Sequence, residues 1–258
     1  MKSLLSRVNP GGGARGATVL IYHRVGGGSP DERDLPVADF AAQLDALQGR
    51  GVVPIDEAVT RLERGDERSS FVVTFDDGFR DVYDNAWPLL RSSCIPFTIY
   101  LATAFIGDTM HWDGSTAKDT GAPALTWEQL SEMVESGLCT VGNHTHTHVR
   151  PELLSDDELD KCTADIEGRL GVTPRHFAYT WGVPVPALER SLRPRFRSAA
   201  TGELGRNLPG DDPLRLRRIP VRQSDPIAFF RAKLEGGLLP ERAYGTLVAA
   251  AKRAGARA

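Results

Sequence analysis

The chain has 258 residues and a formal net charge of -3, and 41% of its residues are hydrophobic and 25% charged. These values are typical of a globular protein with a full core. They argue against nucleic acid as a partner, because binding phosphates requires a concentrated basic face. Nine arginines between Arg190 and Arg222 are a local exception, which we interpret as a solvated, salt-bridged surface.

The cysteines and the N-terminus indicate in which cellular compartment the protein is expected. Cys94, Cys139 and Cys162 are widely spaced, which indicates neither a disulfide framework nor a cysteine zinc site. The N-terminus lacks the apolar run of a signal peptide, and no stretch reaches the length of a membrane span. We therefore expect a cytoplasmic protein with a flexible segment at 1–17 and a single domain at 18–258. The oligomeric state is not predicted.

Short apolar runs alternate with amphipathic segments along the chain. TVLIYH (18–23) predicts a strand that ends at His23, and Phe40, Leu44 and Leu47 then recur at helical spacing. Asp56 is the expected N-cap of a second helix. Further strands are expected at 70–75, 96–103, 138–141, 176–180, 196–201 and 214–221. Further helices are expected at 79–93, 126–137, 155–171 and 185–193.

Two of these helices carry capping signals. Thr126 and Gln129 have capping-box spacing, and so do Ser155 and Glu158. Strands that alternate with helices imply a mainly parallel sheet, either open or closed as a barrel. With about seven strands, the predicted fold class is α/β.

The stretch VVTFDDGFRD (72–81) ends an apolar strand on two adjacent carboxylates. Asp76 and Asp77 follow Phe75 directly and precede Gly78. In α/β folds ligands bind beyond the carboxyl ends of the strands, so paired acids there indicate a metal ion, a shared proton or both. The alternative is that the two acids only stabilise the N-terminus of the following helix.

A second cluster, GNHTHTHVRP (142–151), contains His144, His146 and His148. The three side chains share one face in an extended chain, whereas His144 and His148 alone come together in a helix or tight turn. Catalytic zinc sites typically use three protein ligands, a set that two histidines and one carboxylate would complete. The alternative is that these histidines make ordinary hydrogen bonds.

As a spaced set, the motifs resemble those of the polysaccharide deacetylase family, also described as NodB-like or carbohydrate esterase family 4. The resemblance lies in VVTFDDG, in VGNHTHTH about sixty residues later, in LTWEQLSEMVESG and in FAYTWG (177–182). It spans roughly residues 18–220. It implies a distorted (β/α)7 barrel and a hydrolase that removes an N-acetyl group from an amino sugar. It also implies one divalent ion, which we expect to be zinc, with cobalt and nickel as alternatives.

The resemblance implies roles for individual residues of the two clusters. Asp76 corresponds to the general base and Asp77 to a metal ligand. His144 and His148 correspond to the other two ligands, and Thr145 lies beside them.

Other positions near the motifs receive lesser roles. His146 falls on a variable position, so we expect a supporting polar residue. The backbone N–H of Trp181 corresponds to the donor that stabilises the tetrahedral oxyanion. Tyr179 and the HWDG stretch (111–114) are candidates for contact with a sugar ring. Thr180 replaces the proline of the related pattern FAYPxG, which is expected to loosen the turn that presents this N–H.

The leaving amine requires a general acid. Many family members supply a histidine from a C-terminal Leu-x-x-His motif, but no histidine follows His176 in this chain. VLIYHRV resembles the same strand-then-histidine signature moved to the N-terminus, as in the circularly permuted branch that includes poly-N-acetylglucosamine deacetylases. We therefore expect His23 to be the acid, and the alternative is a core histidine.

The implied function is metal-dependent N-deacetylation of an amino sugar in a polysaccharide, an oligosaccharide or a smaller glycoconjugate. One alternative is a catalytically weak carbohydrate-binding member of the family, because Thr180 alters the third motif. Another is a deacylase or deformylase that acts on a different C–N bond. Retention of both aspartates and both histidines favours the enzyme.

Overall fold

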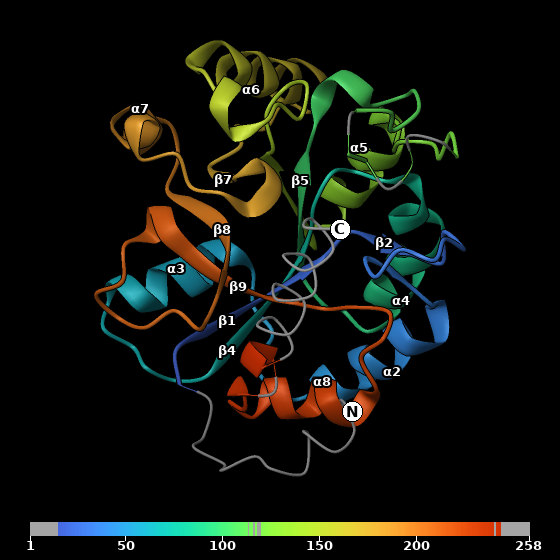
Figure 1. Cartoon of the computed structure of the whole chain (residues 1–258), viewed down its shortest axis with the longest axis vertical. Helices are drawn as coiled ribbons and strands as arrows, with labels where there is room; N and C mark the ends of the chain where they lie inside the picture. Colours follow the sequence, from blue (N-terminus) through green and yellow to red (C-terminus); the bar gives the residue numbers. More distant parts are fainter. Residues whose placement is uncertain (1–14, 113, 116, 118–119, 240, 244–258) are drawn as a thin grey trace, which may run out of the picture.

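Seven parallel strands close into a barrel at the centre of the molecule (Figure 1). This computed structural model describes residues 15–112, 114–115, 117, 120–239 and 241–243. The strands follow one another around the barrel in chain order, and helices surround them, which confirms the predicted (β/α)7 fold. They are β1 (Ala17–Tyr22), β4 (Ser70–Phe75), β5 (Phe97–Leu101), β6 (Cys139–Asn143), β7 (His176–Ala178), β8 (Ser198–Leu204) and β9 (Leu216–Pro220).

The ends of the chain are only partly described. Residues 1–14, most of the segment expected to be flexible, lie outside the described residues, and so do residues 244–258. β1 begins at Ala17, one residue before the expected start of the domain. Within the described part, none of the helices has both the length and the apolar character needed to cross a bilayer.

The alternation of side chains along β4 decides which of its residues face the barrel interior. Phe71, Val73 and Phe75 pack in the cluster between barrel and helices. Val72 packs in a separate cluster, called here the interior cluster, with residues of other barrel strands such as Tyr100 and Leu216 and with residues of α3 (Ile55–Glu63). Because side chains of a strand alternate between its two faces, Asp76 follows on the interior side.

The same alternation of side chains applies to β1 and β9, the first and last strands of the barrel. Val19 belongs to the interior cluster and Tyr22 to the outer one, so His23 is the next interior position after β1. On β9, Leu216 belongs to the interior cluster, and Arg218 shares its face. These two strands pair with each other, which closes the barrel.

An aromatic cluster joins the barrel to α2 (Val37–Leu47). The Phe75 ring lies 5.4 Å from that of Tyr22, 5.9 Å from that of Phe40 and 6.0 Å from that of Phe97. All four side chains are buried, and each such aromatic contributes roughly 1.5–3 kcal/mol by leaving water. The helical spacing of Phe40, Leu44 and Leu47 is thereby confirmed.

One predicted capping box is confirmed, and the other is only half formed. Thr126 and Gln129 form a complete capping box at the start of α5 (Trp127–Glu135). The Ser155 side chain accepts from the Glu158 N–H at the start of α6 (Asp156–Leu170). The remaining α-helices of the described residues are α3 (Ile55–Glu63), α4 (Trp87–Ser92), α7 (Glu189–Arg195) and α8 (Ile227–Leu234).

Three local expectations need correction. Asp56 does not cap α3, because Pro54 occupies the N-cap and the Asp56 carboxylate instead accepts from Arg197 at 2.6 Å. The helix expected at 79–93 begins with a π-helical turn over Val82–Ala86. α8 was not expected, because its buried residues, which include Phe229, Phe230 and Lys233, leave no amphipathic pattern in the sequence.

Candidate active site

The motif residues meet at one end of the barrel. Asp76 and Asp77 follow β4, His144 follows β6 and His23 follows β1, so they lie beyond the carboxyl ends of parallel strands. Together with Arg218 they line one cavity of about 240 Å³. Parallel strands therefore bring together residues that the sequence separates by more than a hundred positions.

A tight turn after β4 aims Asp77 toward the histidines. Asp77 and Gly78 both have left-handed backbone angles, with φ of 78° and 100°. A Cβ on Gly78 would lie only 3.0 Å from the Leu101 side chain. The position therefore favours glycine both by its φ and by this close approach.

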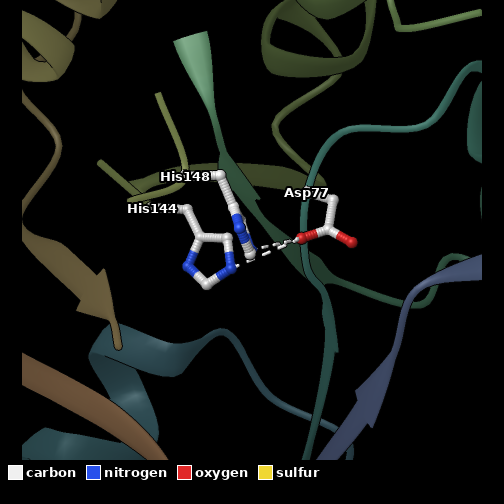
Figure 2. Close-up of side chains that lie close together, drawn as sticks. All are labelled: Asp77, His144 and His148. Carbon is white, nitrogen blue, oxygen red and sulfur yellow. Dashed lines mark ion pairs between the residues drawn. The ribbon is translucent and has the colours of Figure 1, made fainter. Parts of the chain in front are cut away.

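Asp77, His144 and His148 form a buried three-residue group (Figure 2). Asp77 Oδ1 lies 3.4 Å from His144 Nε2 and 3.3 Å from His148 Nε2. These separations are too long for good charge-assisted hydrogen bonds, which measure about 2.7–2.9 Å. They match the edge of a tetrahedron of ligands about 2.0–2.2 Å from a central ion. The group therefore fits a divalent metal better than a hydrogen-bonded cluster.

The ring of His144 is oriented for ligation. His144 Nδ1 donates to the Ala178 carbonyl at 2.8 Å, which leaves Nε2 as the lone-pair nitrogen that faces Asp77. Burial raises the pKa of Asp77, but contacts with His144 and His148 outweigh it and hold the pKa well below its usual value. Asp77 is thus an ionised carboxylate, the form that a metal requires.

Asp76 is bound by a guanidinium that the motifs did not reveal. Arg218 donates from Nη1 and Nη2 to the two Asp76 oxygens at 2.6 and 2.8 Å, and from Nε to the Thr201 carbonyl. The Arg218 side chain is 0% exposed and that of Asp76 4%. Burial raises the pKa of Asp76, but Arg218 and then His144 oppose it, and the pKa is lowered overall. Asp76 is therefore ionised, as a general base must be.

Arg218 belongs to the arginine-rich region that we interpreted as salt-bridged surface. That interpretation holds for neighbours such as Arg193, which pairs with Asp212 at 2.9 Å, but not for Arg218. The sequence signal that could have identified Arg218 as buried is the alternation of side chains along the strand. Arg218 lies two residues from the buried Leu216 in a predicted strand and so shares its interior face.

His23 is a half-buried wall of the same cavity. Burial lowers its pKa, Asp77 and Asp76 oppose this change, and Arg33 and Arg218 add to it, so that the pKa is lowered overall. A lowered pKa makes the imidazolium a stronger acid than an ordinary histidine.

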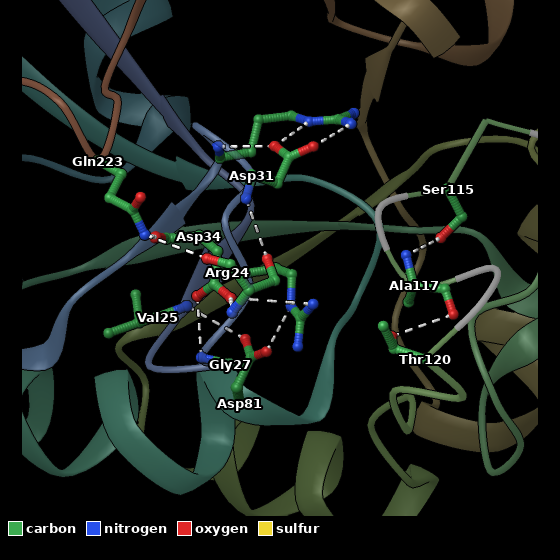
Figure 3. A network of polar contacts seen from close by, with 12 residues as sticks. Arg24, Val25, Gly27, Asp31, Asp34, Asp81, Ser115, Ala117, Thr120 and Gln223 are labelled. Carbon is green, nitrogen blue, oxygen red and sulfur yellow. Dashed lines mark hydrogen bonds and ion pairs between the residues drawn. The ribbon is translucent and has the colours of Figure 1, made fainter.

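A buried ion pair ties the backbone after His23 to the segment after Asp77 (Figure 3). Arg24 Nε donates to Asp81 at 2.7 Å, and the Val25 N–H donates to the same carboxylate at 3.2 Å. The segments that follow β1 and β4, which carry His23 and Asp77, are therefore connected directly.

Two tryptophans line the cavity next to His148. Trp112, from the HWDG stretch, stacks on the His148 ring with centroids 4.4 Å apart and planes inclined by 26°. Trp181 is 43% exposed and lies 6.0 Å from the same ring. The Arg150 guanidinium lies over the Trp181 indole at 5.2 Å. Trp112 and Trp181 thus form an aromatic wall of the cavity, whereas residue 113 of the HWDG stretch lies outside the described residues. The contact of this stretch with a sugar ring stays a prediction.

The turn that carries Trp181 is anchored by Thr180. Trp181 has a left-handed φ of 61°. The Thr180 hydroxyl donates to the Val149 carbonyl at 2.7 Å, a bond that proline at this position could not make. This hydrogen bond opposes the loosening expected from the loss of proline.

Tyr179 and Thr145 are buried away from the cavity. Ala178 belongs to the interior cluster, so its neighbours Phe177 and Tyr179 point outward, and their rings pack 5.0 Å apart. The expected sugar contact of Tyr179 is therefore corrected. Thr145, which lies between His144 and His148 in the sequence, is 0% exposed. Its backbone N–H donates to the side-chain oxygen of Asn143.

His146 lies outside the metal group. Its Nδ1 is 3.0 Å from Thr103 Oγ1 and 3.0 Å from Asp165 Oδ2, and it is not part of the group of Asp77, His144 and His148. His146 is thus a supporting polar residue, as its variable position predicted.

The sequence profile described as polysaccharide deacetylase matches residues 63–191, half of the chain. The chain belongs to the polysaccharide deacetylase family. The match covers the segment with Asp76, Asp77, His144 and His148, whereas His23 and Arg218 lie outside it.

Relatives with longer matches extend the comparison. The solved structure of IcaB from Ammonifex degensii is 32% identical, with a TM-score of 0.72, over 86% of this chain and 97% of that one. The poly-beta-1,6-N-acetyl-D-glucosamine N-deacetylase of Staphylococcus epidermidis is 31% identical over 147 residues. The deacetylase PplD of Streptococcus pyogenes, 22% identical with a TM-score of 0.68 over 82% of this chain and 94% of that one, shares the fold. The chain spans about half the length of the curated relatives it matches, 48% in each case.

Replacing Asp77 or His148 by alanine is expected to abolish metal binding, because the two remaining ligands cannot form a closed site. After dialysis against zinc, elemental analysis should find one ion per chain in the wild type and in the Asp76→Asn control. It should find almost none in either alanine variant. A full metal content in Asp77→Ala would contradict the ligand assignment.

Replacing Arg218 by methionine is expected to lower the free energy of unfolding by about 3–5 kcal/mol, because it leaves a buried carboxylate unpaired. Urea denaturation measures this change. The double variant Asp76→Asn/Arg218→Met should recover part of the loss, because both charges are then removed. If Arg218→Met had the stability of the wild type, the ion pair with Arg218 would not offset the cost of burying the Asp76 carboxylate.

Proposed function

We propose that the chain is a metal-dependent N-deacetylase that acts on an N-acetylated amino sugar in a polysaccharide or oligosaccharide. The observation that carries this proposal is the presence, in one cavity, of a three-ligand group and a second ionised carboxylate that is not part of it. The proposal is supported by family membership and by the named activity of the Staphylococcus epidermidis relative.

Zinc is the proposed ion, held by Asp77, His144 and His148, with cobalt and nickel as alternatives because they suit the same ligands. A divalent ion at this site would lower the pKa of a water molecule and polarise the acyl carbonyl. The remaining steps require groups that move protons and stabilise charge.

Asp76 is the proposed general base that takes a proton from the attacking water. Its hydrogen bonds to Arg218 fix the direction of the carboxylate, and its lowered pKa keeps it ionised. We assign Asp76 a different role from Asp77, because the charge of Asp76 is already balanced by Arg218 and does not require a metal ion.

His23 is the proposed general acid that gives a proton to the leaving nitrogen. It lines the same cavity as Asp76, and its imidazolium is an unusually strong acid because burial lowers its pKa. The Trp181 N–H is the proposed donor to the developing oxyanion, presented by the left-handed turn that Thr180 anchors.

The decisive experiment measures acetate release from short N-acetylglucosamine oligomers by the purified protein. We expect release that a chelator removes, that zinc or cobalt restores and that Asp76→Asn lacks while keeping its metal. A zinc-loaded protein that releases no acetate would contradict the proposal. It would favour a different acyl group or a carbohydrate-binding role.

His23→Ala is expected to lower turnover by about 10²–10⁴-fold, the usual contribution of one proton-transfer group, while metal content stays unchanged. The control is Lys161→Ala, since Lys161 is exposed on α6 and pairs with Asp157. Equal turnover in the two variants would assign His23 to a packing role.

A further inference from the structure

The two histidines of the metal group are held in different ways. His144 has the usual arrangement, in which the ring nitrogen away from the metal donates to a carbonyl, here that of Ala178 at 2.8 Å. The corresponding atom of His148, Nδ1, is buried and has no hydrogen-bond partner among the described residues. Its position must therefore be determined by ring stacking on Trp112 and by its backbone.

The backbone that carries His148 is strained. Thr145 and His148 both have left-handed angles, with φ of 68° and 52°. Such conformations cost roughly 1–3 kcal/mol each in a non-glycine residue, and they persist only where surrounding contacts impose them. The contacts that hold residues 145–148 thus determine where the His148 ring lies.

Glu158 of α6 supplies the contacts next to His148. Its carboxylate accepts from the Thr147 N–H at 2.8 Å and from the Thr147 hydroxyl at 2.9 Å, one on each oxygen. Its carbonyl also accepts from the His146 N–H at 3.1 Å. One residue therefore holds two consecutive positions of the strained loop.

Glu158 is itself fixed. It lies in the first turn of α6, where its own N–H donates to the capping hydroxyl of Ser155 at 3.4 Å. Further along the helix, Asp165 lies 3.0 Å from His146. The loop is thus held against one rigid helix at several points.

We propose that Glu158 is a positioning residue for His148 and that it sets the affinity and geometry of the metal site. This inference rests on the metal-binding part of the proposed function. Glu158 reaches neither the metal group nor the cavity lining and acts through Thr147, which precedes the ligand directly.

The test compares Glu158→Gln and Glu158→Ala with Glu167→Ala. Glu167 is the matched control because it belongs to the same helix, is exposed and also accepts from a threonine hydroxyl, that of Thr173 at 2.7 Å. The zinc dissociation constant is measured by competition with a chromophoric chelator. The visible absorption of the cobalt-loaded proteins reports ligand geometry.

We expect Glu158→Ala to weaken zinc binding by about 10–100-fold and to change the cobalt spectrum, because supporting groups of metal ligands commonly have effects of this size. Glu158→Gln should change both less, because its amide can accept from the Thr147 N–H and donate to the Thr147 hydroxyl oxygen. Glu167→Ala should keep the wild-type constant and spectrum. If Glu158→Ala does not fold, Glu158→Met, which has a similar volume and lacks the carboxylate, carries the test.

Two results would separate this inference from the proposed function. Wild-type zinc affinity and cobalt spectrum in Glu158→Ala would overturn the positioning role while leaving the deacetylase proposal intact. A wild type that binds zinc but releases no acetate, with weakened zinc binding in Glu158→Ala, would support the positioning role and contradict the deacetylase.

Discussion

The site depends on the pairing of β1 with β9, which closes the barrel. β1 lies between β4 and β9, so closure places His23, Asp76 and Arg218 on adjacent strands at one end of the barrel. Asp76 and Arg218 are separated by 142 positions in the sequence. In an open sheet these strands would lie at opposite edges, and the guanidinium could not reach the carboxylate.

Closure also explains why an apolar strand ends on two adjacent acids. Both carboxylates are buried at 3% exposure, and an uncompensated ion in that environment costs several kcal/mol. Arg218 neutralises Asp76 within the protein, whereas the nearest partners of the Asp77 carboxylate are the imidazoles of His144 and His148. The charge of the first acid is therefore balanced within the protein, and the second has a charge that a divalent cation would balance. Because side chains alternate along β4 and the chain turns at Gly78, Asp76 points toward Arg218 and Asp77 toward the two histidines.

Backbone strain is concentrated at the same end of the barrel. Of the five non-glycine residues with positive φ in the described part, Asp77, Thr145, His148 and Trp181 lie at or beside the metal group. Such conformations are stable only where neighbouring contacts determine them. Glu158 and the Thr180 hydroxyl are examples, and both act on the backbone and not on the ligands directly.

Local signals were sufficient for most of the fold and for half of the site. Alternating strands and helices, the two capping pairs at Thr126 and Ser155, and the spacing within each motif depend on neighbours in sequence, so they could be predicted directly. α8 was not predicted because its apolar and charged residues do not separate onto two faces: Ile227 is exposed, whereas Lys233 is buried. Asp56 was misjudged because an acid near a helix start fits both a cap and a first-turn position.

The sequence by itself determined an α/β fold of about seven strands. Its motifs, through their resemblance to the family, predicted the closed barrel and the grouping of Asp77 with His144 and His148. Only the tertiary structure decided that Arg218 is a buried partner, that Tyr179 faces away from the cavity and that Glu158 supports His148. The physical reason is that these contacts join strands and helices distant in sequence. Their geometry depends on barrel closure and on which face of each strand a side chain occupies at the end of the barrel. The spacing of residues in the sequence does not specify either.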